Sequence, residues 1–227
     1  MSDGGSITRV GMAPRADGLT FEAAQEHWRT EHGDVASGIP GLQHYVQNHA
    51  ILRSGKPLLP YPGFDVCSEL RFADFDTMRS GFASDHYRQT VRADETNLID
   101  KTRFMMVLTR RRVIGGGEPP EGAVKLMTFL RVHPSSTAAK LVQTLEGPYA
   151  EAAGEAGPLR HELLITHAEE HEPEVPPCCE AIDILWFASP EDALGALTGV
   201  LSGRPGWLLA GVAFGTARLL ATPIRQV

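Results

Sequence analysis

The segment Ile114-Gly-Gly-Gly-Glu-Pro-Pro-Glu-Gly122 interrupts the chain near its middle and separates two halves of similar length. Glycine and proline at this density favour a linker over a helix or a strand. With a linker at 114–122, the 227 residues divide into a first half, residues 1–113, and a second half, residues 123–227. Each half has the size of a small domain.

The pattern of predicted elements repeats on the two sides of this linker. In the first half the sequence predicts strands and helices in the order strand 8–13, helix 20–32, strand 42–49, strand 66–72, helix 74–83 and strand 103–109. In the second half it predicts strand 124–132, helix 136–154, strand 159–165, strand 182–187, helix 190–201 and strand 208–219. Both halves therefore have the order β-α-β-β-α-β, which is that of a ferredoxin-like unit.

A ferredoxin-like sheet has helices on one face only, so its bare face must be buried against something else. The other half of the same chain can supply that cover. We therefore expect an α+β fold in which tandem ferredoxin-like repeats form a pseudo-dimer within one chain, with further pairing into a homodimer left open.

Composition and charge narrow the classes of partner. A net charge of −7 argues against nucleic acid and anionic membranes, which need a concentrated basic surface. The three cysteines are an odd number with no disulfide framework, which favours a reducing, cytoplasmic compartment. The polar, non-basic start of the sequence does not look like a secretory signal. A small-molecule substrate is the remaining class of partner.

The residues with the most useful chemistry lie close together between positions 27 and 45. Trp28 and His32 are four residues apart, so they share a helix face, and His27 lies about 100° around the helix from them. We expect His32 in the last turn of the helix, where the helix dipole favours a protonated imidazole. Tyr45 follows on the next strand, after a Pro-Gly turn, and could converge with His32 on a small substrate.

Two other sets of residues are candidate sites. Glu69 could act as a base if its strand face meets the helices, whereas a cross-strand partner for Arg71 is the simpler role. His167, His171, Cys178 and Cys179 are residue types that bind zinc, but adjacent cysteines chelate one tetrahedral ion poorly. We therefore expect no metal and no cofactor.

The same residues carry a family resemblance. The pattern Phe21-x5-His27-Trp28-x3-His32, followed by Ile39-Pro-Gly-Leu-x2-Tyr45-Val-Gln47-Asn48, resembles the EthD family of the dimeric α-β barrel superfamily. The segment Asp65-Val-Cys-Ser-Glu69-Leu-Arg-Phe72 and the later acidic residues Asp94, Glu95 and Asp100 are also similar to that pattern. The resemblance covers roughly residues 8–110, which is the first half.

This resemblance implies a function as well as a fold. It implies an intrachain dimeric α-β barrel and a cofactor-independent isomerase, cyclase or lyase acting on a small aromatic, lactone or polyketide-like substrate. The implied catalytic residues are His32, Tyr45 and His27, and the implied substrate-binding residues are Trp28, Gln47 and Glu69. The alternatives are a non-catalytic accessory protein of an oxidative degradation pathway and an oxygenase of the same superfamily, with haem or without a cofactor.

The second half departs from the pattern. If Pro14 is aligned with Pro134, then Trp28 corresponds to Pro148 and His32 to Ala152. If Leu42-Gln-His44 is aligned with Leu159-Arg-His161, then Tyr45 corresponds to Glu162. We therefore expect residues 123–227 to be a degenerate repeat that closes the barrel, with one working site per chain.

Overall fold

The computed structural model of the chain describes residues 5–171 and 176–227. Residues 1–4, which bear on the absence of a secretory signal, lie outside the described residues. So do residues 172–175, between the histidines and cysteines considered for zinc. In the described part of the chain, no helix has the length and apolar character needed to cross a bilayer.

The first half contains a four-stranded set of long strands and a layer of helices. Its strands are β1 (Ile7–Ala13), β2 (Leu42–Ala50), β5 (Val66–Phe72) and β6 (Met105–Gly116), with a short hairpin of β3 (Leu52–Arg53) and β4 (Lys56–Pro57). Its helices are α1 (Phe21–His27), η1 (Trp28–His32), α2 (Gly33–Ser37), α3 (Phe75–Ala83), η2 (Tyr87–Val91), α4 (Arg92–Leu98) and η3 (Lys101–Arg103).

The second half repeats this arrangement. Its strands are β7 (Val124–Val132), β8 (Arg160–Thr166), β9 (Ala181–Phe187) and β10 (Ala213–Arg225). Its helices are α5 (Ala138–Thr144), η4 (Leu145–Tyr149), α6 (Ala150–Gly154), η5 (Ala168–Glu170), α7 (Pro190–Thr198), η6 (Val200–Ser202) and α8 (Arg204–Ala210).

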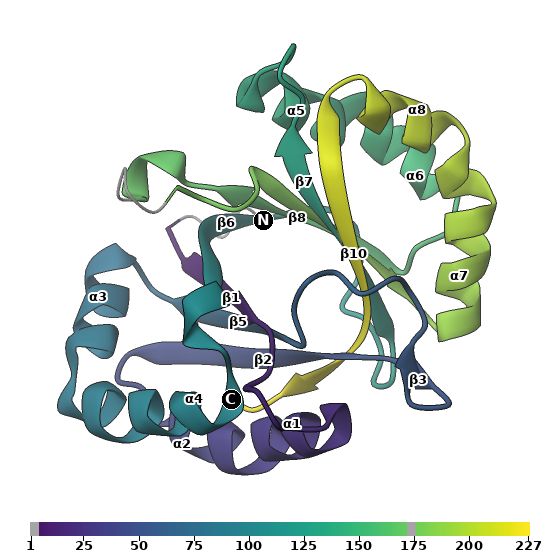
Figure 1. Cartoon of the computed structure of the whole chain (residues 1–227). Helices are drawn as coiled ribbons and strands as arrows, with labels where there is room; N and C mark the ends of the chain where they lie inside the picture. Colours follow the sequence, from purple (N-terminus) through teal and green to yellow (C-terminus); the bar gives the residue numbers. More distant parts are fainter. Residues whose placement is uncertain (1–4, 172–175) are drawn as a thin grey trace.

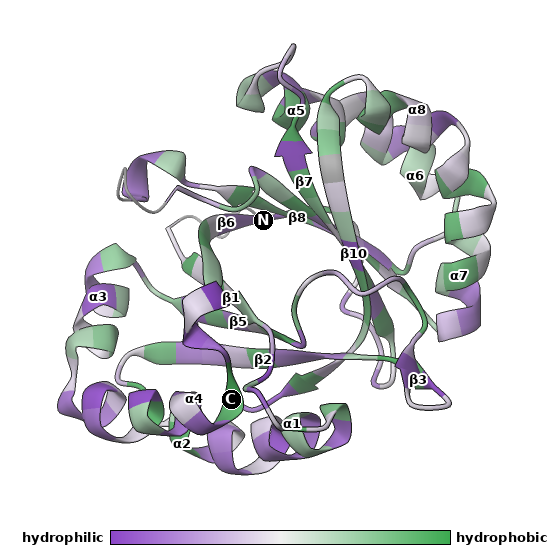
Figure 2. Cartoon of the chain, in the orientation of Figure 1, coloured by the Kyte–Doolittle hydropathy of each residue, from purple (hydrophilic) through white to green (hydrophobic). Residues whose placement is uncertain are grey.

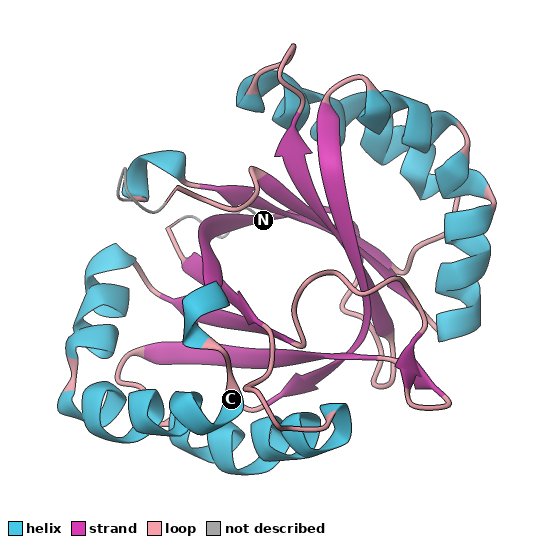
Figure 3. Cartoon of the chain, in the orientation of Figure 1, coloured by secondary structure: helices cyan, strands magenta, loops and turns pink. Residues whose placement is uncertain are grey.

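The eight long strands form one closed antiparallel barrel in the order β1-β5-β2-β10-β7-β9-β8-β6. Each half supplies four neighbouring strands, and the halves join where β2 pairs with β10 and β6 pairs with β8. Figure 1 shows α1 to α4 on one side of the strands and α5 to α8 on the other. The helices lie outside the strands (Figure 3) and carry both hydrophilic and hydrophobic residues, as expected of helices that cover a sheet (Figure 2). The predicted α+β fold of the dimeric α-β barrel kind is therefore confirmed.

Some element boundaries differ from those predicted. The first long helix does not end at His32 but continues to Ser37, through a π-helical turn at residues 28–32. Part of the segment predicted as the last strand is helix α8, and β10 begins only at Ala213. Strand β6 also runs into the glycines of the predicted linker, as far as Gly116. Apolar residues around Leu208 fit a helix packed on a sheet as well as a strand, so hydropathy alone could not separate the two.

The barrel interior is apolar except for a cluster of charged residues that joins the two halves. Glu69 on β5 is buried and forms a salt bridge with Lys125 on β7, which is also buried. Arg111 Nη2 lies 3.1 Å from Glu69 Oε2, and Asn48 Nδ2 donates to Glu69 Oε1 over 2.9 Å. Burial would raise the pKa of Glu69, but the positive charges of Lys125 and Arg111 outweigh burial and lower its pKa to about 2.

This lowered pKa makes a prediction about acid stability. A carboxyl whose pKa falls from 4.5 unfolded to about 2 folded stabilises the fold above pH 4.5, and this stabilisation is lost as the pH falls toward 2. The variant Glu69→Gln lacks this contribution. We expect the wild type to lose about 2 kcal/mol of unfolding free energy relative to Glu69→Gln between pH 5 and pH 3.

Urea unfolding at a series of pH values measures that difference. The matched control is Glu26→Gln, because Glu26 pairs with Arg29 on the exposed surface and such pairs contribute little to stability. A difference between wild type and Glu69→Gln that stays constant from pH 5 to pH 3 would contradict the prediction.

Candidate functional site

The helix that carries His27, Trp28 and His32 is fixed at both ends by local interactions. Thr20 Oγ1 accepts a hydrogen bond from the backbone N–H of Ala23 over 3.1 Å, which caps the first turn. After the helix, Gly41 has φ of 78°, which an L side chain rarely adopts, and this turn leads into β2. The site is therefore positioned by a capped helix and a glycine turn that were both visible in the sequence.

Asp94 on α4 links the two histidines of this helix. His32 Nδ1 lies 2.8 Å from Asp94 Oδ2, and His27 Nε2 lies 2.8 Å from Asp94 Oδ1. Hydrogen bonding to His32 lowers the pKa of Asp94 more than partial burial raises it, and His27 adds to the lowering. Asp94 is consequently ionised near neutral pH.

The ionised carboxylate fixes how the two rings carry their protons. A carboxylate only accepts hydrogen bonds, so His32 must donate from Nδ1 and His27 must donate from Nε2. In a neutral His32 the lone pair is then on Nε2, the ring nitrogen that does not face Asp94. This arrangement of a histidine oriented by a carboxylate suits a general base.

Two buried groups hold the Tyr45 hydroxyl in place. Its hydroxyl oxygen accepts hydrogen bonds from Trp28 Nε1 over 3.1 Å and from Gln47 Nε2 over 3.0 Å. Burial raises the pKa of Tyr45 more than the hydrogen bonds with Gln47, Ser68 and Trp28 lower it. Tyr45 therefore stays protonated near neutral pH and can donate its own hydrogen.

His32, Trp28 and Tyr45 line one cavity between the helices and the outer face of the sheet, with a volume of about 50 Å³. The structure thus brings together three of the predicted site residues. Most of the remaining lining is apolar or aromatic, from residues that include Ile39, Leu70, Phe82, Val91, Leu98 and Phe104. A largely apolar lining lowers the local dielectric constant and so strengthens electrostatic interactions within the cavity.

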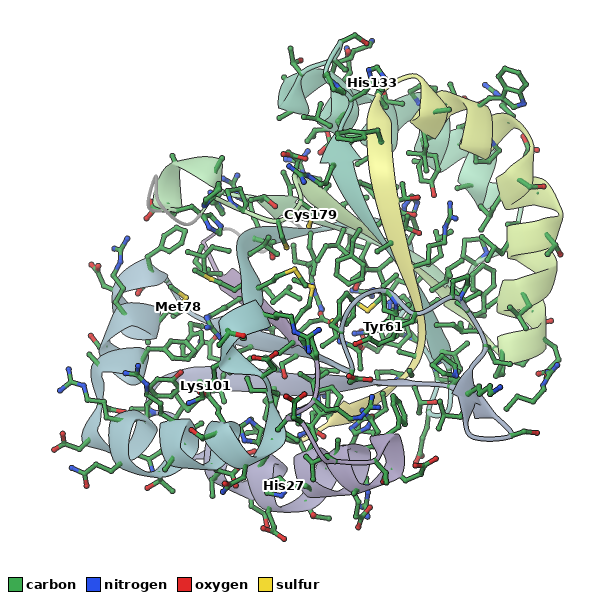
Figure 4. All side chains as sticks on the ribbon, in the orientation of Figure 1. His27, Tyr61, Met78, Lys101, His133 and Cys179 are labelled. Atoms are coloured by element: carbon green, nitrogen blue, oxygen red, sulfur yellow. The ribbon has the colours of Figure 1, made fainter. Side chains whose placement is uncertain are left out.

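Other predicted residues lie outside this cavity. His27 contacts Asp94 and does not line the cavity; Figure 4 shows it on the outer helical layer. Gln47 is fully buried and supports the site, because its amide donates to the Trp28 carbonyl and to Tyr45. Its Oε1 accepts a hydrogen bond from Gln226 Nε2 over 3.0 Å, so the end of the second half supports the site of the first.

Glu69 is on the wrong face of its strand for the predicted role. Val66, Ser68 and Leu70 of β5 face the cavity, so the alternation of a strand turns Glu69 into the barrel interior, where Lys125 binds it. The expectation that Glu69 lies in the pocket is wrong in this structure. Its partner is also not Arg71, because the nearest cations come from β7 and β6.

Four polar residues of the cavity were not predicted as site residues. Arg9 lies on β1, Ser68 lies on β5, and Tyr87 and Glu95 lie on the helical segment after α3. Of these, only Glu95 belongs to the family pattern, together with Asp94. For Arg9 the sequence offered only the alternation of β1, which places Arg9 and Gly11 on one face of the strand.

Neither a larger cavity nor a cluster of metal-ligand types adds to this chemistry. A cavity of about 450 Å³ lies near Arg15, Tyr61 and Arg103, and none of the predicted site residues lines it. Among the described residues, His27, Glu31 and Asp94 place possible metal-ligand atoms within 4.8 Å of one another. Both oxygens of Asp94 already accept hydrogen bonds from histidines, and Glu31 is exposed, so this group lacks the features of a built metal site.

The helices and strand pairings of the two halves show which second-half positions correspond to the site residues, and these positions differ from those of the sequence alignment. The N-cap Thr20 is matched by Thr137, and the π-helical turn 28–32 by 145–149, so His32 is equivalent to Tyr149. A register shift in β2 makes Tyr45, which pairs with Leu70, equivalent to His161, which pairs with Leu185. The sequence alignment was therefore wrong by three residues in the helix and by one in the strand.

The second half keeps polar groups at these equivalent positions. Tyr149 Oη donates to Asp183 Oδ2 over 2.6 Å, and His161 Nε2 lies 2.7 Å from Asp183 Oδ1. All three residues are buried, and Tyr149 belongs to the apolar core of that half. The tyrosine ring therefore fills space that forms part of a cavity in the first half.

Comparisons with known proteins agree with this fold. Residues 16–102 match the model of the EthD domain, which confirms the resemblance seen in the sequence over those residues. No curated protein matches the chain.

Solved structures similar to the chain span almost all of it. An anthrone oxidase-like protein is 9% identical with a TM-score of 0.68, over 100% of this chain and 96% of the other. A protein provisionally assigned as a monooxygenase from Lactobacillus acidophilus NCFM is 13% identical with a TM-score of 0.57, over 98% and 95%. A mutant chlorite dismutase from Candidatus Nitrospira defluvii is 8% identical with a TM-score of 0.54, over 98% and 92%. At these identities the likeness shows the fold alone.

The arrangement around Asp94 makes a prediction about the tautomers of the two rings. In the wild type, His32 carries its proton on Nδ1 and His27 on Nε2. In Asp94→Asn, the amide has one accepting oxygen and one donating nitrogen, so one of the two rings must reverse its tautomer. We also expect a loss of about 1–3 kcal/mol of stability, because one hydrogen bond to a charged group is replaced.

Long-range ¹H–¹⁵N spectra distinguish the tautomers by the shifts of the ring nitrogens. Asp76→Asn is the matched control, since Asp76 is an exposed aspartate on α3 that pairs only with Arg79 among the described residues. A wild-type His32 protonated on Nε2 alone would contradict the assignment.

Proposed function

We propose that this chain, whose residues 16–102 form an EthD domain, is a cofactor-independent acid–base enzyme acting on a small aromatic, lactone or polyketide-like substrate. The observation that carries the proposal is the position of His32, which is held by Asp94 through Nδ1 and lines a mostly apolar cavity together with Tyr45.

In the proposed reaction, His32 Nε2 removes a proton from a carbon next to a carbonyl group of the substrate. The electrons of that C–H bond move into an enolate, and the negative charge collects on the carbonyl oxygen. Asp94 stabilises the imidazolium that forms, because its carboxylate is already bonded to Nδ1. Return of the proton to a different carbon completes an isomerisation. In a cyclisation the enolate carbon attacks a second carbonyl carbon of the same substrate, the π bond of that carbonyl opens to an alkoxide, and the alkoxide takes the proton back from His32.

Tyr45 has the complementary role at the oxygen. The phenol stays protonated because burial raises its pKa, so it can donate a hydrogen bond to the carbonyl oxygen as charge develops there. Trp28 and Gln47 both donate to the Tyr45 oxygen, so the phenolic hydrogen is directed to Ser68, the third hydrogen-bond partner of Tyr45, which a substrate oxygen would replace. Under this proposal His27 is a positioning residue, since it holds Asp94 from outside the cavity.

The size of the cavity limits what can bind without movement. A volume of about 50 Å³ is well below the roughly 300–1,000 Å³ of ordinary ligand sites. A bicyclic substrate would need side chains at the rim to move, and Phe104, which is partly exposed, lies at that rim. The same volume does not admit a porphyrin, so the cavity as it stands does not fit haem.

The proposal predicts the effect of replacing the two central residues. His32→Ala should lower turnover about 10²–10⁴-fold, which is the usual contribution of a general acid–base group. Tyr45→Phe should lower it less, because one hydrogen bond is lost and the aromatic ring remains. The matched control is His133→Ala, because the imidazole of this second-half histidine hydrogen-bonds only to Ser135 among the described residues, so its loss should leave turnover unchanged.

Exchange of substrate C–H hydrogen for deuterium in heavy water, followed by NMR, detects proton abstraction before the product is known. The panel consists of small lactones, phenols and cyclic ketones. Full exchange activity in His32→Ala would exclude His32 as the base. Tight binding across the panel with no exchange and no turnover would favour the accessory-protein alternative.

A further inference from the structure

Arg9 is a positive charge on the wall of the cavity that the proposed acid–base chemistry does not use. It lies on β1, on the same face as Gly11, and lines the cavity with His32 and Tyr45. Its guanidinium lies 4.3 Å from the ring centre of Phe82 and 5.2 Å from that of Phe104. Two aromatic faces therefore hold the charged group in place.

Arg9 lacks an ion-pair partner within the described part of the chain. Its short-range contacts there are with the two rings, and no carboxylate forms a salt bridge with it. The carboxylate of Glu95 acts on Arg9 through its charge, but it is already bound to Tyr87 Oη at 3.1 Å and to Lys101 Nζ at 3.2 Å. Burial lowers the pKa of Arg9, with Tyr87 and Glu95 opposing that change, yet an arginine remains charged at neutral pH.

Arg9 is partly buried, and packing against two rings removes part of the water around its guanidinium. A partly desolvated cation without a carboxylate partner is costly, so such groups are usually paired or used to bind a ligand. Glycine at residue 11 lets Arg9 and Phe104 pack closely against β1, because a methyl group there would lie 3.3 Å from Phe104 and 3.5 Å from Arg9 Nη1. A ligand at Arg9 would therefore displace Phe104, which lies at the rim of the cavity. The planar guanidinium can donate two parallel hydrogen bonds to a carboxylate.

We propose that Arg9 is a substrate-binding residue that recognises a carboxylate, so that the substrate of this cavity is a small organic acid carrying an aromatic or lactone ring. This inference rests on the proposed function, which it deepens by naming the anionic group of the substrate. The carboxylate would lie against Arg9 on β1, while the ring carbon to be deprotonated would lie toward His32 on the helix. Binding through Arg9 fixes the orientation of the substrate and is not itself a step of the reaction.

The test compares benzoate with benzyl alcohol, a neutral probe with the same ring, and with acetate as a smaller carboxylate. Chemical-shift titration of the labelled protein measures each dissociation constant without any turnover. We expect the wild type to bind benzoate at least about tenfold more tightly than benzyl alcohol, as one charge-assisted pair provides. In Arg9→Met, which keeps an unbranched side chain between the two rings, that preference should fall below about twofold, and Arg9→Lys should restore part of it.

Arg29→Met is the matched control, because Arg29 lies on the exposed helix surface with Glu26 and should leave the preference unchanged. Equal binding of the two probes by the wild type, no detectable binding of benzoate or acetate, or an unchanged preference in a folded Arg9→Met would each overturn the proposal. The variant His32→Ala separates the two proposals. It should lose deuterium exchange while keeping the preference for benzoate. The exchange experiment therefore tests the catalytic role of His32, the binding experiment tests the carboxylate site at Arg9, and either can fail without the other.

Discussion

The rest of the structure depends on one constraint, which is that neither half of the chain can bury both faces of its own sheet. The helices of each half cover one face, and the other face is covered only when the two sheets close into a barrel. Closure brings the inward side chains of both halves together, and most of these are apolar. The exception is the cluster of Glu69, Lys125 and Arg111, in which charges from both halves neutralise one another away from water.

Barrel closure also explains why the site lies outside the barrel and not within it. Side chains that point inward are committed to the shared core, so the face that meets the helices is the one with space for a ligand. There the chain combines groups from β1, β2, the first helix and α4, which lie far apart in the sequence. The second half still contributes, because Gln226 at the end of the chain holds Gln47 beneath Tyr45.

The two halves show how the same framework can hold different chemistry. The position of His32 is taken by Tyr149 in the second half, and that of Tyr45 by His161. These residues share Asp183 in a buried network, and the tyrosine packs into the apolar core. The sequence alignment suggested that the second half had lost these groups. It has acid–base groups at the equivalent positions, but they are bonded to one another inside its core. This supports the proposal of one working site per chain.

The sequence alone determined the repeated order of elements, the α+β class and the helix that carries Trp28 and His32. These follow from local signals, namely the N-cap at Thr20, the turn at Gly41 and the alternation of β2, which act over a few residues. It also placed Tyr45 beside that helix, since a short turn leaves few alternatives. Only the tertiary structure decided which residues complete the site. Asp94 reaches His32 from 62 positions away, and Arg9 lines the cavity because β1 pairs between β5 and β6 of the same half. The register shift in β2 was invisible without its partner strand. The same limit applies to Glu69, because a strand's alternation shows which residues share a face but not which face meets the helices.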